Sequence, residues 1–105
     1  MNLLFAGVPQ REPTELHYQW VVEAGRLLLE VHLSYACLTE AETAALLGAG
    51  VKDLVALSCP DPRTGGNLSL NMRCASAAAN TLLEQEGELR YGPVTLVLRE
   101  MPPGT

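Results

Sequence analysis

Two stretches of the chain alternate between apolar and polar residues with a period of two, and one follows the other almost directly. They cover residues 16–23 and 26–36. One phase of the alternation is apolar throughout and consists of Leu16, Tyr18, Trp20, Val22, Leu27, Leu29, Val31, Leu33 and Tyr35. A period of two puts successive side chains on opposite faces of a strand, whereas a helix needs apolar residues three and four apart. Because Gly25 can supply the positive φ of a tight turn, the pattern predicts an antiparallel hairpin.

A helix is predicted directly after this hairpin. Thr39 and Glu42 have the spacing of a capping box, in which the hydroxyl accepts from the third helical amide and the carboxylate reaches back. Alanine and leucine then continue to Leu47. Gly48 and Gly50 are typical of a helix end, so the helix is expected to stop there.

Further along the chain, three more elements are predicted. Residues 53–59 are followed by a proline and residues 67–73 alternate again, which favours a second hairpin of 53–59 with 67–73. The alanine-rich stretch 75–86 predicts a second helix that stops at a glycine. Residues 89–100 predict a last strand, interrupted at a Gly-Pro pair.

The predicted order β-β-α-β-β-α-β defines an α+β fold. We expect an antiparallel or mixed sheet of about five strands with two helices packed on one face, in a single domain over 1–105. Residues 1–12 and 101–105 are expected to fray. Four positions recur 37 residues apart and would fit two similar halves: Leu33, Cys37, Thr39 and Ala41 return as Leu70, Cys74, Ser76 and Ala78.

Composition and charge exclude several classes of protein. The apolar content of 48% is too high for a disordered chain with a net charge of −5. Seven scattered lysines and arginines argue against nucleic-acid binding, because that affinity comes from neutralised phosphates. The chain has neither the ~20-residue apolar run of a membrane span nor the basic start of a signal peptide. We therefore expect a cytoplasmic protein, and its six arginines against one lysine are consistent with a GC-rich bacterial or phage genome.

Seven residues are candidates for binding a partner protein. Tyr18 and Trp20 are aromatic residues of a strand face, and both types are enriched at interfaces. Val21 and Leu28 are apolar at positions where the alternation calls for polar residues, which indicates that both faces of the hairpin are covered, by the N-terminal segment or by a second subunit. The third group is an acidic cluster that could meet a basic partner, and it consists of Glu84, Glu86 and Glu88.

Few residues suggest catalysis. His17 and His32 lie on the polar faces of paired strands and, with Glu23 and Glu30, resemble half of a metal site or an acid–base pair. Cys74 precedes the predicted second helix and follows an arginine, and both features lower a thiol pKa. With a histidine as base, it is the candidate nucleophile. No third ligand and no oxyanion motif accompany these residues, so we expect neither metal nor cofactor.

In size, acidity and strand-rich α+β make-up, the chain is loosely similar to bacterial secretion chaperones and to small phage-encoded inhibitors and immunity proteins, without a shared motif. Such a resemblance implies a non-catalytic module that binds another protein. The surplus apolar strand surface adds the expectation of a homodimer. Two alternatives remain: a small thiol- or histidine-dependent enzyme or ligand-binding subunit, and a structural subunit that assembles through sheet edges. If the protein is such a structural subunit, Thr95→Pro would break the assembly and leave the monomer folded.

Overall fold

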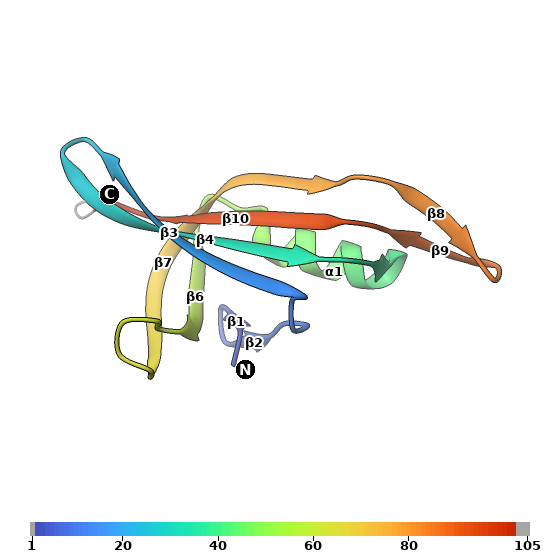
Figure 1. Cartoon of the computed structure of the whole chain (residues 1–105), viewed down its shortest axis with the longest axis horizontal. Helices are drawn as coiled ribbons and strands as arrows, with labels where there is room; N and C mark the ends of the chain where they lie inside the picture. The colour runs from blue at the N-terminus through green and yellow to red at the C-terminus, as the bar shows by residue number, and fades with distance from the viewer. Residues whose placement is uncertain (1, 103–105) are drawn as a thin grey trace.

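A computed structural model describes residues 2–102, except for the side chain of Gln85. Ten strands and one helix follow each other in these residues (Figure 1). Their bounds are β1 Leu4–Phe5, β2 Val8–Pro9, β3 Glu15–Glu23, β4 Arg26–Tyr35, β5 Leu38–Thr39, α1 Glu40–Gly50, β6 Val55–Pro60, β7 Asn67–Ala79, β8 Leu82–Gln85, β9 Glu88–Tyr91 and β10 Val94–Glu100.

The strands form two antiparallel sheets. The larger sheet has seven strands in the order β2-β1-β6-β7-β10-β4-β3, and the smaller has three in the order β5-β9-β8. The smaller sheet is mainly the far end of one long hairpin, because β7 leads into β8 and β9 leads into β10. This hairpin gives the molecule its length, and the tip between β8 and β9 lies at the opposite end from the tip between β3 and β4 (Figure 1).

Both predicted hairpins are confirmed. β3 and β4 pair regularly from Glu15↔Ser34 to Glu23↔Arg26, within one residue of the predicted bounds. β6 pairs with the first part of β7. Paired residues of an antiparallel sheet share a face, so the apolar phase of 16–36 lies on one side of the sheet. We call this side, which faces α1, the inner face, and the opposite side the outer face.

The first predicted helix is also confirmed, together with its cap. The Thr39 hydroxyl accepts from the Glu42 amide at 3.2 Å, and the Glu42 carboxylate accepts from the Thr39 amide at 3.0 Å. The helix continues through Gly48 to Gly50, slightly further than predicted. It lies behind β10 and β4 in the view of Figure 1 and covers the inner face of the sheet with Thr43 and Leu46.

The predicted fold class is wrong, because the protein is mostly β, with 58% strand and 11% helix. The helix predicted over 75–86 is absent, and so is the five-strand sheet with two helices. Residues 76–79 instead continue β7 and pair with 94–97 of β10. Alanine favours a helix by at most ~0.7 kcal/mol per residue over other ordinary residues, and ladder hydrogen bonds to a buried strand outweigh that preference here.

Two further expectations need correction. Thr95 lies in β10, which is hydrogen-bonded to β4 on one side and β7 on the other, so Thr95→Pro would break an internal ladder instead of a free edge. The 37-residue echo is not matched in structure, since Ser76 and Ala78 are in a strand where Thr39 and Ala41 begin a helix.

The core lies between the inner face, α1 and the N-terminal segment. It contains fully buried side chains of β4, β6, β7 and β10, and also Leu3 and Phe5 from the segment 1–12 that was expected to fray. Of the C-terminal residues expected to fray, Met101 is described and donates to the Asn71 carbonyl, while 103–105 lie outside the described residues. Among residues 2–102, no helix is both long and apolar enough to span a membrane.

Candidate protein-binding surface

β3 is the last strand of the seven-stranded sheet, and in the described part of the chain β4 is the only strand that pairs with it. A two-residue loop joins the two strands, with φ of 51° at Ala24 and 75° at Gly25. In such a hairpin the pair that closes the loop, Glu23↔Arg26, is hydrogen-bonded, and hydrogen-bonded pairs recur at every second position. The intervening residues direct their backbone groups away from β4, and they are Leu16, Tyr18, Trp20 and Val22.

A contact on β4 supports this assignment. Leu29 pairs with Trp20, so the same alternation turns the Leu29 amide away from β3. On that side it donates to Glu100 Oε1 at 3.0 Å. Among residues 2–102, no strand pairs with the far edge of β3, which therefore presents a row of backbone donors and acceptors along nine residues.

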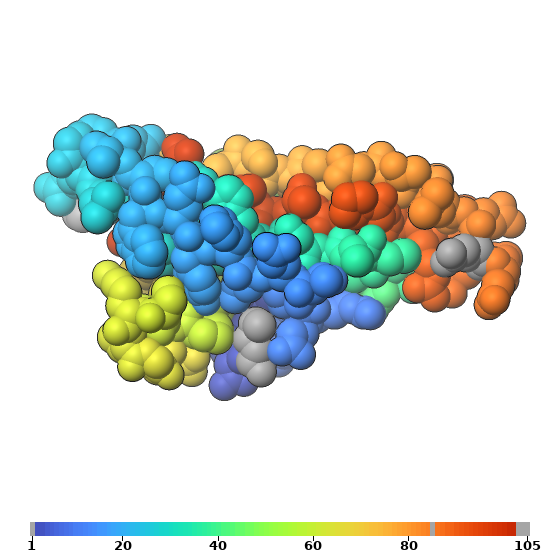
Figure 2. Space-filling view, viewed as in Figure 1, coloured from blue at the N-terminus to red at the C-terminus, as the bar shows by residue number. Residues whose placement is uncertain are grey.

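The end of the β3–β4 hairpin carries exposed apolar side chains. Trp20 is 37% exposed, Val22 74% and Leu27 65%, and Val22 and Leu27 are direct cross-strand partners. We call these three residues the apolar tip. They belong to the inner-face phase of the alternation but extend past the part of the sheet that α1 covers, and the tip projects at the left end of the molecule (Figure 2).

The end of β6 and the loop that follows it contact this part of β3 and hold it in place. The Tyr18 hydroxyl donates to the Pro60 carbonyl at 2.5 Å, and burial raises the pKa of Tyr18. The Arg63 guanidinium lies 5.9 Å from the centre of the Trp20 ring, within the range of a cation–π contact. Half-buried Tyr18 thus fixes the strand, while Trp20 remains open to a partner.

Val21 and Leu28, the other apolar candidates, face each other across β3 and β4 on the outer face. Leu28 is only 2% exposed in the single chain, and Val21 is half-buried. Leu28 lies outside the main core cluster. Val21 and Leu28 therefore offer a partner little exposed apolar surface. The apolar tip exposes more.

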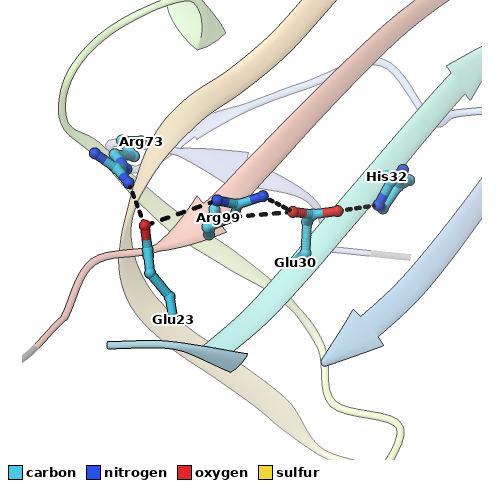
Figure 3. A network of polar contacts seen from close by, with 5 residues as sticks. All are labelled: Glu23, Glu30, His32, Arg73 and Arg99. Carbon is cyan, nitrogen blue, oxygen red and sulfur yellow. Dashed lines mark hydrogen bonds and ion pairs between the residues drawn. The ribbon is translucent and has the colours of Figure 1, made fainter. Parts of the chain in front are cut away.

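A network of ion pairs crosses the outer face beside this pair (Figure 3). Arg99 donates to Glu30 Oε2 through Nε at 2.9 Å and Nη2 at 2.7 Å, and His32 Nε2 lies 2.7 Å from Glu30 Oε1. Glu23 Oε1 lies 3.1 Å from Arg73 Nη2 and 3.9 Å from Arg99 Nη1. The network links β3, β4, β7 and β10, so it makes the hairpin rigid before any partner arrives.

Glu30 is the most buried member of the network, with 6% of its surface exposed. Burial by itself would raise its pKa, but hydrogen bonds from Arg99 and His32 outweigh that effect and hold the pKa below its usual value. The carboxylate is therefore charged and fully engaged, which is the arrangement of a structural ion pair rather than of a catalytic acid.

The two histidines meet as the sequence suggested. His17 and His32 are cross-strand partners, with ring centres 5.7 Å apart and an interplanar angle of 82°. Glu30 is held by Arg99, and Glu23 by Arg73. No group of three or more His, Cys, Asp or Glu side chains within residues 2–102 is placed to hold a metal ion.

The argument for an activated Cys74 fails in the structure. Cys74 lies inside β7, opposite Leu98 of β10, and no helix begins after it. Burial raises the pKa of its thiol, and Sγ donates to the Ser76 carbonyl at 3.5 Å, which favours the protonated thiol. Of the two features expected to lower the pKa, the helix is absent, and the guanidinium of Arg73 is hydrogen-bonded to Glu23.

The acidic candidates lie far from the apolar tip. Glu84, Glu86 and Glu88 surround the β8–β9 turn at the opposite end of the molecule, which is 49 Å long (Figure 1). The predicted binding residues thus form two separate groups. Val22 and Leu27 were missed, although they share the phase of the buried residues, because the alternation does not show where the core ends.

Comparison of the chain with family models, with curated proteins and with solved structures gave no match.

Proposed function

We propose that the protein is a small, acidic, non-catalytic binding module that accepts an extended strand of a partner protein along the free edge of β3. The observation that carries this proposal is the nine-residue edge, whose outward backbone groups run directly into the exposed apolar tip. Main-chain hydrogen bonds would supply affinity, and the alternating side chains would supply specificity.

β3 carries acidic residues at its two ends, Glu15 and Glu23, but has no other feature that protects an edge strand from pairing. Natural edge strands are usually short, or carry proline, lysine or a bulge that prevents edge-to-edge contact. β3 contains none of these, and its register with β4 is regular over nine pairs. The opposite edge of the same sheet, β2, has two residues and ends at Pro9. The contrast supports β3 as the binding edge.

The apolar tip supplies the anchor that such a contact needs. Binding energy at interfaces is concentrated in a few central residues, among which tryptophan is enriched. Trp20 is the one tryptophan of the chain, and it lies on the edge strand beside Val22. The ion-pair network on the outer face lowers the cost of ordering this hairpin on binding.

The experiment compares two lysine substitutions at exposed apolar residues. Val22→Lys places a charge on the binding edge, whereas Leu54→Lys changes a residue that is 57% exposed and precedes β6. Immobilised wild type and Leu54→Lys should both retain the same purified protein, be it another chain or a second copy, while Val22→Lys loses it. Trp20 fluorescence should shift on binding. A chain that remains monomeric and retains nothing would overturn the proposal.

A further inference from the structure

We propose that the strand which β3 accepts is β3 of a second copy, antiparallel to the first, on a two-fold axis that passes through Trp20. This inference rests on the proposed function and names its partner. A two-fold contact is isologous, so the same patch must be complementary to itself. For each possible alignment of the two strands, the sequence of β3 shows whether the residues that face each other are complementary.

Symmetry leaves few registers open. A two-fold axis perpendicular to the sheet keeps the two outer faces on the same side, so each residue pairs with a partner residue of the same phase. A register centred on Gln19 places Glu15 opposite the partner's Glu23, twice, and like charges directly opposite destabilise a sheet. A register centred on Tyr18 places His17 opposite the partner's Gln19. In this register Glu23 has no opposite residue within the partner's β3.

The register centred on Trp20 is the complementary one. It places His17 opposite the partner's Glu23, and symmetry repeats the pair on the other side of the axis. On the same outer face, Gln19 lies opposite the partner's Val21. On the inner face, Tyr18 lies opposite the partner's Val22, and the two Trp20 residues meet at the axis, where an aromatic pair is favourable.

Glu23 has acceptor capacity for this contact. Its Oε1 receives Arg73, but its Oε2 has no hydrogen-bond donor among the described residues although the atom is inaccessible to solvent. A buried acceptor without a donor costs free energy. The ring N–H of a histidine from the partner strand is a suitable donor, and a rotation of the one-third exposed carboxylate would bring it within reach.

Cysteine cross-linking tests the register. In the Trp20-centred pair, residues 19 and 21 of opposite chains form a non-hydrogen-bonded pair with Cα atoms about 4.5 Å apart, within disulfide range. A mixture of Gln19→Cys and Val21→Cys chains should therefore form mixed dimers on mild oxidation, and neither variant alone should. Wild type, with its three native cysteines, is the control. Cross-linking of Gln19→Cys to itself would overturn the register.

A negative charge placed at position 17 gives an independent test. His17→Glu faces the partner's Glu23 in both symmetric pairs and should weaken the dimer about tenfold in Kd, since each cross-strand pair contributes several-fold. His17→Lys should keep the affinity. Light scattering after size exclusion measures the mass, and thermal unfolding shows whether both variants fold. Equal dimer affinity for the two variants would contradict the proposed pair.

Failure of this inference can be told apart from failure of the proposed function. If wild type is monomeric at every concentration and no mixed disulfide forms, the second copy is excluded. The proposed function then still stands if Val22→Lys, and not Leu54→Lys, loses another purified protein. If neither substitution changes the binding of any protein, both proposals are overturned.

Discussion

Gly48 and Gly50, two residues apart in α1, show how the environment of a single position decides the effect of one methyl group. A Cβ at Gly50 would lie 2.5 Å from Leu96 Cδ2 and 3.1 Å from Phe5 Cε2, whereas a Cβ at Gly48 would meet nothing within 4 Å. Leu96 is fully buried, so a shift of its side chain would disturb the core around it. Close packing of α1 on the sheet therefore depends on Gly50.

We expect opposite effects from the two alanine substitutions. Gly50→Ala should lower the free energy of unfolding by about 1–3 kcal/mol through overpacking. Gly48→Ala should raise it by up to ~1 kcal/mol, because alanine is the better helix former in open space. Urea unfolding of both variants measures the difference. A stabilising Gly50→Ala would contradict the packing of α1 against β10.

The lowered pKa of Glu30 predicts how stability depends on pH. A carboxyl whose pKa is lower in the folded than in the unfolded state stabilises above its unfolded value, close to 4.5, and this contribution is lost as pH falls through the folded value. Glu30→Gln should therefore destabilise at pH 7 by about 1–3 kcal/mol, because the half-buried Arg99 loses its charged partner. The difference from wild type should shrink below pH 4.

The control for this prediction is Glu88→Gln. Glu88 accepts from Arg90 at 2.9 Å, but its side chain is half exposed, and exposed ion pairs contribute little. Chemical unfolding at pH 7 and pH 3 compares the three proteins. If the loss caused by Glu30→Gln is the same at both pH values, the contact with Arg99 does not act through charge.

At the scale of elements, three hairpins use the same kind of turn. The loops Ala6-Gly7, Ala24-Gly25 and Glu86-Gly87 each have two residues, both with positive φ. This is the geometry of a type I′ turn, whose twist matches that of the strands, and it favours asparagine before glycine. The first residue of each loop is thus strained, since a non-glycine residue in the left-handed region costs about 1 kcal/mol.

Ala24→Asn should relieve part of this strain. Asparagine tolerates the left-handed conformation, so we expect a gain of about 0.5–1 kcal/mol in the free energy of unfolding. Ala44→Asn, at an exposed position of α1, is the control and should destabilise, because asparagine forms helices less well than alanine. Thermal unfolding of the two variants should shift in opposite directions. A lower Tm for Ala24→Asn would argue against a type I′ turn.

These elements also show what the sequence could predict. The β3–β4 hairpin and the start of α1 were predicted correctly because alternation and a capping box act locally. The strand within 75–86 was not predicted, because its alanines do not alternate with polar residues. Only the pairing of this segment with β10 makes it a strand. The turn at Glu86-Gly87 resembles that at Ala24-Gly25, and this similarity was the available signal.

The candidate surface was predictable to a similar degree. Alternation identified Trp20 on a strand face, and the Val21–Leu28 pair was predicted as a break in the pattern. That β3 is an edge, and that Val22 and Leu27 are exposed, depends on the strand order of the whole sheet. Strand order arises from contacts distant in sequence, which a local pattern does not encode.

At the scale of the whole molecule, the long hairpin makes the protein elongated. Its radius of gyration is 14.3 Å, against about 13 Å for a compact chain of this length. The excess comes from β8 and β9, which pair with each other and extend beyond the core. Beyond this pair, the three-stranded sheet contains only the two-residue β5, which pairs with β9. Their apolar residues Leu82, Leu83 and Leu89 are 51%, 45% and 36% exposed.

This shape predicts unequal stability along the chain. Amides of β8 and β9 should exchange with solvent by local opening, because few buried contacts hold them, whereas amides of β4 and β10 should exchange only on global unfolding. Hydrogen exchange followed by NMR at low protein concentration would measure this as protection in β4 and β10 at least a hundredfold greater, equivalent to about 2.7 kcal/mol or more. Equal protection at both places would mean that the β8–β9 hairpin unfolds with the core, and that its exposed leucines are covered in solution by a surface this single chain does not provide.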